Sequence, residues 1–249
     1  MKIQSFVIHL KRATKRRQNA ERLIAQLPYK PKIFEAVDGK QLSEDQLNAV
    51  YSRRSFFKPN FPFPMSNGEI ACFLSHRELW QKIVDEELDG ALIVEDDVKL
   101  NVQKFKKAID CCLPLLAELG YIQFQVRSIE DKFECLHQTK VAAIFRPKVV
   151  PLRTSCQLIS NAMAKKLLSI SQKIDRPVDG FLQLSWETGH KPVYVEPSGV
   201  SDLTKTLEGS TIAPIKPTGI FAKIYREVNR LLYRWAIYRY SSRWRKKAR

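Results

Sequence analysis

A short apolar run that ends in three adjacent carboxylates is the feature that most constrains the fold of this chain. Residues 91–94 are long enough for one buried strand, and Glu95, Asp96 and Asp97 follow directly. Three like charges at a strand end repel one another, so a cation, hydrogen bonds or open water must compensate them. No Lys or Arg stands inside the triplet, and the nearest is Lys99. This favours a hard divalent cation with oxygen ligands, which in an α/β domain commonly holds a phosphate-bearing ligand.

The positive charge of the chain is concentrated at its C-terminal end. The formal net charge is +16, and residues 221–249 hold ten Lys or Arg and one acid, Glu227. Apolar residues recur there at helical spacing, with Arg226, Arg230 and Arg234 on another face. The pattern predicts a basic amphipathic helix that adsorbs to an anionic membrane surface. The alternatives are a core-packed helix followed by a solvated charge run, and a nucleic-acid-binding segment.

Length and patterning favour one large domain, residues 1–215, followed by the tail, residues 216–249. With 44% hydrophobic residues the chain can bury a sizeable core. Expected strands and helices alternate early in the chain, which favours an α/β fold with a mostly parallel sheet. The five cysteines are odd in number and lack zinc-ligand spacing, which favours a reducing, cytoplasmic compartment. The first ten residues are too short an apolar run for a signal peptide, and no stretch predicts a transmembrane helix.

Apolar periodicity and capping residues predict the individual elements. Strands are expected at residues 3–10, 32–37, 91–94, 121–126, 141–145, 155–160 and 192–195. Helices are expected at residues 14–27, 102–119, 162–170 and 178–187, and after Ser43 and Ser66. Thr14 is expected to cap the first helix, and the pairs Ser43 with Gln46 and Ser66 with Glu69 predict capping boxes. Residues 56–64, rich in Pro and Phe, predict an irregular loop that faces a substrate.

Several blocks of the sequence, in matching order and spacing, carry a resemblance to a known family. They are residues 6–12 with Arg16-Arg17, residues 36–39, residues 68–77 with Trp80, residues 93–97, and, more weakly, residues 154–160 and 177–179. These blocks resemble glycosyltransferase family 25, the lipooligosaccharide (LPS) biosynthesis transferases similar to β-1,4-galactosyltransferases. The chain departs from the pattern at Ala71, where a second Gly is usual, and at Cys156-Gln157, where a small residue and Tyr are common.

The resemblance implies a GT-A-type, Rossmann-like fold that binds a nucleotide sugar. It implies inverting transfer of galactose from UDP-galactose to a growing lipooligosaccharide, with a divalent metal, manganese or else magnesium. The expected partners are the UDP-sugar donor, a glycolipid or oligosaccharide acceptor and an anionic membrane, without nucleic acid. The expected location is cytoplasmic, peripheral on the inner face of the bacterial cytoplasmic membrane.

Within this reading, Glu95 and Asp97 are the expected metal ligands. Asp97 is the direct ligand, and Glu95 contacts the ribose or a metal-bound water. Because side chains alternate along a strand, Glu95 and Asp97 share one face, and Asp96 points away to orient neighbouring groups. The alternative is an acidic loop after a buried strand.

Donor-binding residues are expected at the ends of the first two strands, midway along the helix after Ser66, and at the acidic triplet. They are His9, Lys11, Arg12, Arg16, Asp38, Ser75, His76, Arg77, Glu95 and Asp96. Four of these residues also have a structural alternative. Arg16 would lie on a solvated helix face, Asp38 would form an ordinary Asp-Gly turn, and His76 and Arg77 would be a core His and an Arg whose stem covers apolar surface.

Inverting transfer needs a base that takes the proton of the acceptor hydroxyl, and Asp179 is the candidate. The alternative is an acid in the first turn of a helix. Glu187, Glu196 and His190 are further candidate bases, and His190 is also a candidate third metal ligand. Two rival functions stay open: a metal-dependent phosphohydrolase that uses the same carboxylates, and a basic nucleic-acid-binding protein.

Overall fold

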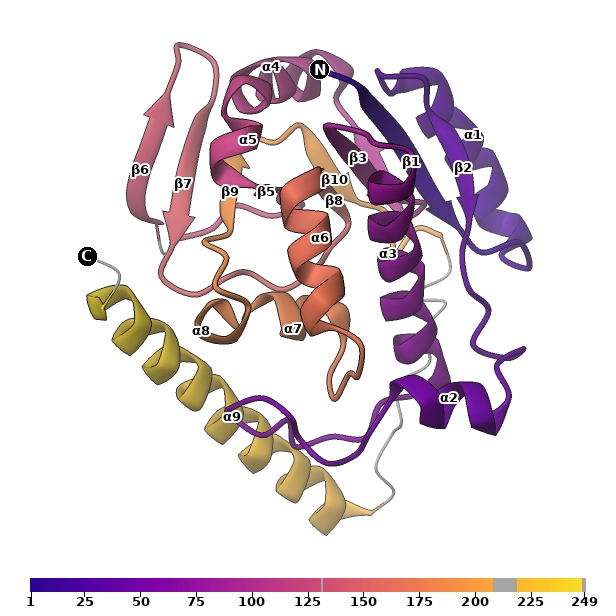
Figure 1. Cartoon of the computed structure of the whole chain (residues 1–249), viewed down its shortest axis with the longest axis vertical. Helices are drawn as coiled ribbons and strands as arrows, with labels where there is room; N and C mark the ends of the chain where they lie inside the picture. The colour runs from indigo at the N-terminus through magenta and orange to yellow at the C-terminus, as the bar shows by residue number, and fades with distance from the viewer. Residues whose placement is uncertain (131, 208–218, 248–249) are drawn as a thin grey trace.

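The computed structural model describes residues 1–130, 132–207 and 219–247, built around an eight-stranded sheet (Figure 1). The order across the sheet is β2-β1-β3-β8-β5-β9-β7-β6. These strands are β1 (Ile3–His9), β2 (Lys32–Glu35), β3 (Gly90–Glu95), β5 (Tyr121–Phe124), β6 (Lys132–Gln138), β7 (Ala143–Pro147), β8 (Cys156–Ser160) and β9 (Val193–Glu196). A small antiparallel sheet pairs β4 (Val98–Leu100) with β10 (Val200–Asp202). The sequence patterns did not predict β4, β6 or β10.

The large sheet is mixed, so the expected mostly parallel sheet is only partly confirmed. Strand β1 pairs in parallel with β2 and β3, and β5 pairs in parallel with β9. The other neighbouring pairs are antiparallel, because β8 runs back between β3 and β5, and β7 and β6 form a hairpin at one edge. Strands β1, β3, β5 and β9 nevertheless point the same way. Their carboxyl ends therefore reach one edge of the sheet, where α/β proteins bind ligands.

The helices largely follow the predicted ranges. They are α1 (Thr14–Gln26), α2 (Glu44–Val50), α3 (Asn67–Asp85), α4 (Val102–Cys112), α5 (Leu116–Leu119), α6 (Asn161–Ile170), α7 (Val178–Leu182), α8 (Ser185–Thr188) and α9 (Ile220–Lys247). Both predicted capping boxes are confirmed, at Ser43 and Ser66. The cap at Thr14 is wrong, because Thr14 is the first helical residue and Ala13 precedes it without a side-chain cap. The single helices expected at residues 102–119 and 178–187 are each interrupted.

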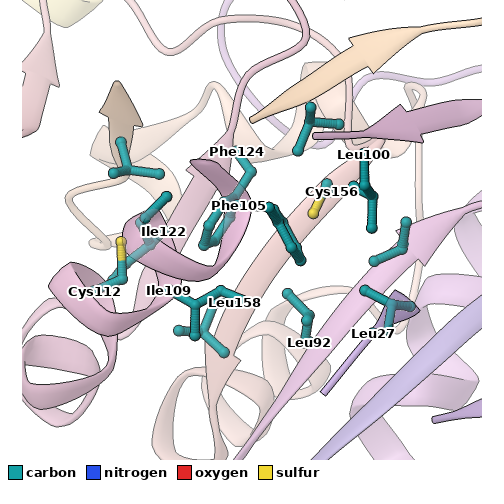
Figure 2. Packing of buried hydrophobic residues seen from close by; sticks show 14 of the residues in the cluster. Leu27, Leu92, Leu100, Phe105, Ile109, Cys112, Ile122, Phe124, Cys156 and Leu158 are labelled. Carbon is teal, nitrogen blue, oxygen red and sulfur yellow. The ribbon is translucent and has the colours of Figure 1, made fainter. Parts of the chain in front are cut away.

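Helices cover both faces of the sheet. Side chains alternate along each strand, so the buried strands present apolar residues to both faces. Leu92 and Val94 of β3 pack against α1 and α4, whereas Ala91 and Ile93 pack against α3, α6 and α7. Figure 2 shows part of the first core, in which Phe105 of α4 lies beside aromatic and aliphatic side chains of the strands. Burial of one such large side chain stabilises the folded state by about 1.5–3 kcal/mol. The two cores therefore hold in place the strand end that carries the acidic triplet.

Helix α9 runs along the outside of the body, past α8 and the Pro-rich loop (Figure 1). Residues 56–64 contain no helix or strand, as predicted. The phenol of Tyr233 accepts a hydrogen bond from Nη1 of Arg176 at 3.0 Å, and its ring lies 5.4 Å from that of Phe61. The expected domain boundary at residues 215 and 216 falls outside the described residues. Among the described helices, none combines the length and the apolar character that a membrane span requires.

Candidate functional site

The acidic triplet lies at the carboxyl end of β3 and divides between two sides of the sheet. Strand β3 ends at Glu95, and Asp96 and Asp97 form the turn that leads into β4. The amide Nδ2 of Asn19 holds this turn by donating to the carbonyl oxygens of Asp96, at 2.8 Å, and Val98, at 2.9 Å. Helix α1 therefore sets the path of the turn. The prediction that Glu95 and Asp97 share one face assumed that the strand continues to Asp97. The strand ends at Glu95, so side-chain alternation does not apply to Asp97.

Asp96 is buried and faces α1, where two basic side chains surround it. Its Oδ2 lies 2.7 Å from Nδ1 of His9, and its Oδ1 accepts from Nη1 of Arg16 at 2.8 Å. The same guanidinium nitrogen lies 3.2 Å from Oδ2 of Asp97. Arg16 is only 5% exposed, so the solvated-helix-face alternative is wrong for this residue. The guanidinium of Arg16, which is 80 positions from Asp96 in the sequence, therefore compensates part of the negative charge of the triplet.

Glu95 faces α3 on the other side of the strand. Its Oε1 accepts a hydrogen bond from Oγ1 of Thr154 at 2.8 Å and lies 3.4 Å from Nε2 of His76. Burial pushes the pKa of Glu95 upward, but the interactions with His76, Thr154 and Arg16 outweigh it and hold the pKa below its ordinary value. Glu95 is therefore a carboxylate at neutral pH, available as an oxygen ligand.

Asp97 has the opposite electrostatic setting. Burial, followed by repulsion from Glu95, raises the pKa of Asp97 to about 6; Asp96 and Asp202 raise it further, and Arg16 lowers it. Oγ1 of Thr204 donates to its Oδ2 at 3.3 Å. Negative charge thus exceeds positive charge around Asp97. A bound divalent cation would correct this imbalance, so the residues present fit the expected metal.

Asp179 lies in the first turn of α7, as its structural alternative predicted. Its two carboxylate oxygens accept hydrogen bonds from the backbone N–H groups of Gly180, at 2.7 Å, and Arg153, at 3.2 Å. Burial raises the pKa of Asp179, the two N–H groups lower it, and the charge of Glu95 raises it again. The net rise brings the carboxylate closer to the pKa of an effective general base. Its interaction with Glu95 places Asp179 in the same electrostatic environment as the triplet.

The segment before β8 joins these carboxylates. Arg153 has a φ of 82°, an uncommon value for a residue with a side chain. Its backbone N–H holds Asp179, while its guanidinium pairs with Asp202 of β10. The next residue, Thr154, holds Glu95. A locally strained backbone that positions several carboxylates together is typical of functional sites.

The remaining predicted residues on α3 are only partly brought into the cluster. Oγ of Ser75 accepts from the backbone N–H of Val37 at 2.9 Å and donates to the carbonyl of Ala71 at 2.8 Å, so it ties α3 to the loop after β2. Burial lowers the pKa of Arg77, and its Nε is buried without a hydrogen-bond partner in the described part of the chain. His76 is fully buried beside Glu95.

The basic residues after β1 form a more exposed rim. Nε of Arg12 donates to Oδ2 of Asp38 at 2.8 Å, which joins the loops after β1 and β2. A hydrogen bond from the backbone of Lys40, together with Arg12, lowers the pKa of Asp38. That backbone bond is the Asp-Gly turn of the structural alternative, so Asp38 is a turn residue as well as a site candidate. Lys11 is exposed.

The other candidate bases have different partners. Glu187 is exposed and accepts from the backbone of Lys58 in the Pro-rich loop. Glu196 pairs with Ser128, in the segment after β5, and with Lys132 of the edge strand β6. Burial, then the charge of Lys166, lowers the pKa of His190 to about 3, and the described residues give its Nε2 no hydrogen-bond partner. No described contact joins these three groups directly to Glu95 or Asp97.

A cavity of about 310 Å³, lined by both polar and apolar side chains, lies at the same edge of the sheet, between the segments that follow β5 and β9. Arg127 lines it and lies 3.7 Å from the carboxylate of Asp202. Tyr194 also lines it, with a buried hydroxyl that has no partner among the described groups. The ion pair between Arg127 and Asp202 links this cavity to the carboxylate cluster, although the cluster carboxylates do not line it.

Sequence reasoning missed six residues of this arrangement. They are Asn19, Cys72, Arg153, Thr154, Asp202 and Thr204. Most act through contacts that join distant segments, which no local pattern reveals. Cys72 is different, because its spacing of four residues from His76 on a predicted helix was readable as a pair on one face.

An α/β sheet with an acidic cluster at its carboxyl edge defines a class of protein that binds phosphate-bearing ligands. Within that class, the sequence model described as "Glycosyltransferase family 25 (LPS biosynthesis protein)" matches residues 2–182. The chain belongs to glycosyltransferase family 25. The match includes β1, the acidic triplet and Asp179, and it stops before β9, β10 and α9.

Curated relatives carry related names. The chain is 41% identical over 106 residues to procollagen galactosyltransferase 2 of Homo sapiens, a match that covers 42% of this chain and 17% of the relative. It is 36% identical over 195 residues to procollagen galactosyltransferase 1 of Danio rerio, covering 73% and 31% of the two chains. A glycosyltransferase 25 family member of Aedes aegypti is 35% identical over 189 residues, covering 72% and 30%. The chain thus spans less than a third of the length of these relatives.

Proposed function

We propose that this chain is an inverting, metal-dependent galactosyltransferase that moves galactose from UDP-galactose onto a hydroxyl of a surface glycan. The observation that carries the proposal is the cluster of Glu95, Asp97 and Asp179 at the carboxyl edge of the sheet, in a member of glycosyltransferase family 25. Relatives named galactosyltransferases support galactose as the sugar. Residues 1–215 form the catalytic domain in this proposal, with the GT-A-type nucleotide-sugar fold.

The donor would lie across the ends of β1 and β3. Asp97 and Glu95 would hold a divalent cation, manganese or else magnesium, which when bound supplies positive charge to the diphosphate. Lys11 and Arg12, whose side chains are exposed, would contact uridine or phosphate. His9 and Arg16 act through Asp96, because both bind its carboxylate and so fix the turn that presents Asp97.

Asp179 is the proposed general base. The acceptor hydroxyl oxygen forms a bond to the anomeric carbon of galactose, and its proton passes to the carboxylate of Asp179. The bond between that carbon and the UDP oxygen breaks, and its electron pair leaves with UDP. The backbone N–H groups of Gly180 and Arg153 hold the carboxylate in position for this transfer.

The acceptor is proposed to be a lipooligosaccharide or related glycolipid, because α9 presents an apolar and basic surface. Large apolar side chains of α9 that are about half or more exposed are Ile220, Phe221, Ile224, Tyr225, Val228, Leu231, Leu232, Trp235 and Tyr238. Lys and Arg side chains flank them, which suits an anionic membrane surface. Residues 216–249 would hold the enzyme peripherally on the inner face of a bacterial cytoplasmic membrane, beside its acceptor.

The test is a product assay with two acceptors. The full chain is incubated with UDP-galactose and manganese, together with either a lipooligosaccharide that lacks its terminal galactose or a procollagen peptide. Mass spectrometry then identifies the product. We expect galactose on the glycolipid and at least a hundred-fold loss of kcat in Asp179→Asn, with donor affinity retained. Transfer to the peptide alone would refute the glycolipid acceptor. Release of inorganic phosphate without transfer would refute the transferase and favour the phosphohydrolase.

A further inference from the structure

Three potential metal ligands meet at the first residue of the acidic triplet, and two of them are softer than a carboxylate. Cys72 and His76 stand four residues apart on α3, so their side chains lie on one face of the helix. Glu95 reaches the same place from the end of β3. One ligand atom from each of these residues lies within 4.8 Å of the other two, and Cys72 is a free thiol.

The spacing fits metal ligation better than it fits a hydrogen bond. Nε2 of His76 lies 3.4 Å from Oε1 of Glu95, which is long for a hydrogen bond to a carboxylate. Zinc bonds of about 2.0–2.2 Å to nitrogen and oxygen, at a tetrahedral angle, place those two atoms about 3.4 Å apart. A sulfur ligand would lie about 3.5 Å from the nitrogen, so the thiol of Cys72, now within 4.8 Å, needs to approach by about 1.3 Å at most.

Gln157 supplies a second observation that points to a ligand. This side chain is fully buried, its Nε2 lies 3.0 Å from Nδ1 of His76, and the described part of the chain gives its Oε1 no partner. A half-turn of the amide brings Oε1 to Nδ1, where it accepts the N–H of a His76 ring whose Nε2 is free to bind a cation. Metal-binding histidines are commonly oriented by such an acceptor on the second ring nitrogen.

We propose that Cys72, His76 and Glu95 form a binding site for a zinc-type cation. This site has Glu95 in common with the oxygen-ligand site but binds its cation without Asp97. A thiolate, an imidazole and a carboxylate together select Zn²⁺ over Mn²⁺ or Mg²⁺. Three protein ligands leave a fourth position for water or a ligand, and the side chain of Glu95 is 24% exposed, so that position opens toward solvent. The inference goes beyond the proposed function, because it holds whether or not the chain transfers galactose.

The test uses Co²⁺ as a spectroscopic probe on the full, reduced chain after removal of metals with a chelator. We expect one equivalent of Co²⁺ to give a thiolate-to-cobalt charge-transfer band, which Zn²⁺ abolishes and excess Mn²⁺ does not. Cys72→Ser should lose the band, and Cys135→Ser, which removes an exposed thiol, should keep it. Absence of the band from the unsubstituted chain, or its survival in Cys72→Ser, would overturn the proposal.

Two further variants separate this site from the one at Asp97. His76→Gln should weaken Co²⁺ binding at least ten-fold, and Gln157→Leu about ten-fold, whereas Asp97→Asn should keep the band. Loss of the band in Asp97→Asn would show that there is only one shared site and would overturn the inference. A measurement on the unsubstituted chain tests the site even if these variants do not fold. Zn²⁺ should protect Cys72, but not Cys135, from alkylation read by mass spectrometry, and equal labelling of Cys72 with and without Zn²⁺ would contradict the site.

Discussion

At the scale of single residues, Arg16 and Asp97 define the electrostatics of the site. Arg16 is buried and contacts the carboxylates of both Asp96 and Asp97, so it offsets part of the repulsion within the triplet. The compensation is incomplete at Asp97, whose pKa is raised to about 6 by burial and by the neighbouring acids. A site built to receive a cation is expected to be strained in this way when the cation is absent.

Removal of the Asp97 charge should therefore stabilise the metal-free chain. A carboxyl with a raised pKa destabilises the fold when it is ionised, so the penalty is absent below its ordinary value of 3.8 and complete above about pH 6. A rise of about two pKa units corresponds to about 3 kcal/mol at most. We expect Asp97→Asn, with chelator present, to raise the free energy of unfolding by about 1–3 kcal/mol at pH 8 and to change it little at pH 4.

Urea denaturation at the two pH values measures this effect. Asp110→Asn, at an exposed position of α4, is the control and should change stability little at either pH. A loss of stability in Asp97→Asn at pH 8 would show that Asp97 is already compensated within the protein.

Loss of the Arg16 guanidinium should be strongly destabilising. Arg16→Met leaves the buried carboxylate of Asp96 and the partly buried carboxylate of Asp97 without their common partner, and breaking a buried ion pair costs about 3–5 kcal/mol. The neighbouring Arg17 offers a matched control, because it pairs with Glu21 on the exposed face of the same helix. Arg17→Met should cost less than about 1 kcal/mol. Similar unfolding free energies for the two variants would contradict the buried network.

The acidic triplet was predictable from the sequence, but its partners were not. An apolar run that ends in Glu95, Asp96 and Asp97 requires compensation, and this much follows from charge alone. The sequence does not show that Arg16, rather than the exposed Arg17, turns inward, because α1 has basic residues at both positions. That choice depends on how α1 packs on the sheet. The sequence indicates His76 as a donor-binding candidate, but the predictions do not include its pairing with Cys72.

At the scale of elements, local signals predicted helix starts better than strand pairing. The capping boxes at Ser43 and Ser66 were readable because each depends on residues three apart. The long helix expected at residues 102–119 breaks at Leu113–Leu115, where Pro114 lacks a backbone N–H. Strand β6 was missed because its two partly buried residues do not form a clear alternation. Direction within the sheet depends on contacts between distant segments, so the antiparallel β8 could not be predicted locally.

Helix α9 supports a prediction at this scale about membrane binding. Leu231 and Trp235 are exposed on the apolar surface of the helix, at 61% and 56%. The variant Leu231→Ser with Trp235→Ser should lower co-sedimentation with phosphatidylserine-containing vesicles about ten-fold or more, because each lost large side chain removes about 1.5–3 kcal/mol of burial in lipid. Binding should also weaken as salt is raised.

Val141→Ser is the matched control, because it removes an exposed apolar side chain at the hairpin of β6 and β7. This variant should sediment like the unsubstituted chain. A chain that lacks residues 221–249 and still pellets with anionic vesicles to the same extent would refute membrane attachment through α9.

At the scale of the whole molecule, the mixed sheet collects its functional groups at one edge. Strands β1, β3, β5 and β9 run in the same direction, and their ends carry His9, the acidic triplet and the segments that line the cavity. The α/β class was predictable from alternating patterns, and family membership from the matching blocks. The arrangement of Asp179, Arg153 and Asp202 around the triplet was not predictable. These residues lie on separate segments of the chain that contact one another only in the folded protein.

The central claim is that this edge binds a UDP-sugar through the carboxylates at residues 95–97. Isothermal titration calorimetry with UDP-galactose, in the presence and absence of manganese, tests it most directly. We predict metal-dependent uptake of one UDP-galactose per chain, and at least a hundred-fold weaker binding in Asp97→Asn, with the folded state of the variant verified by circular dichroism. Binding that is equally strong without manganese, or unchanged in Asp97→Asn, would contradict the account.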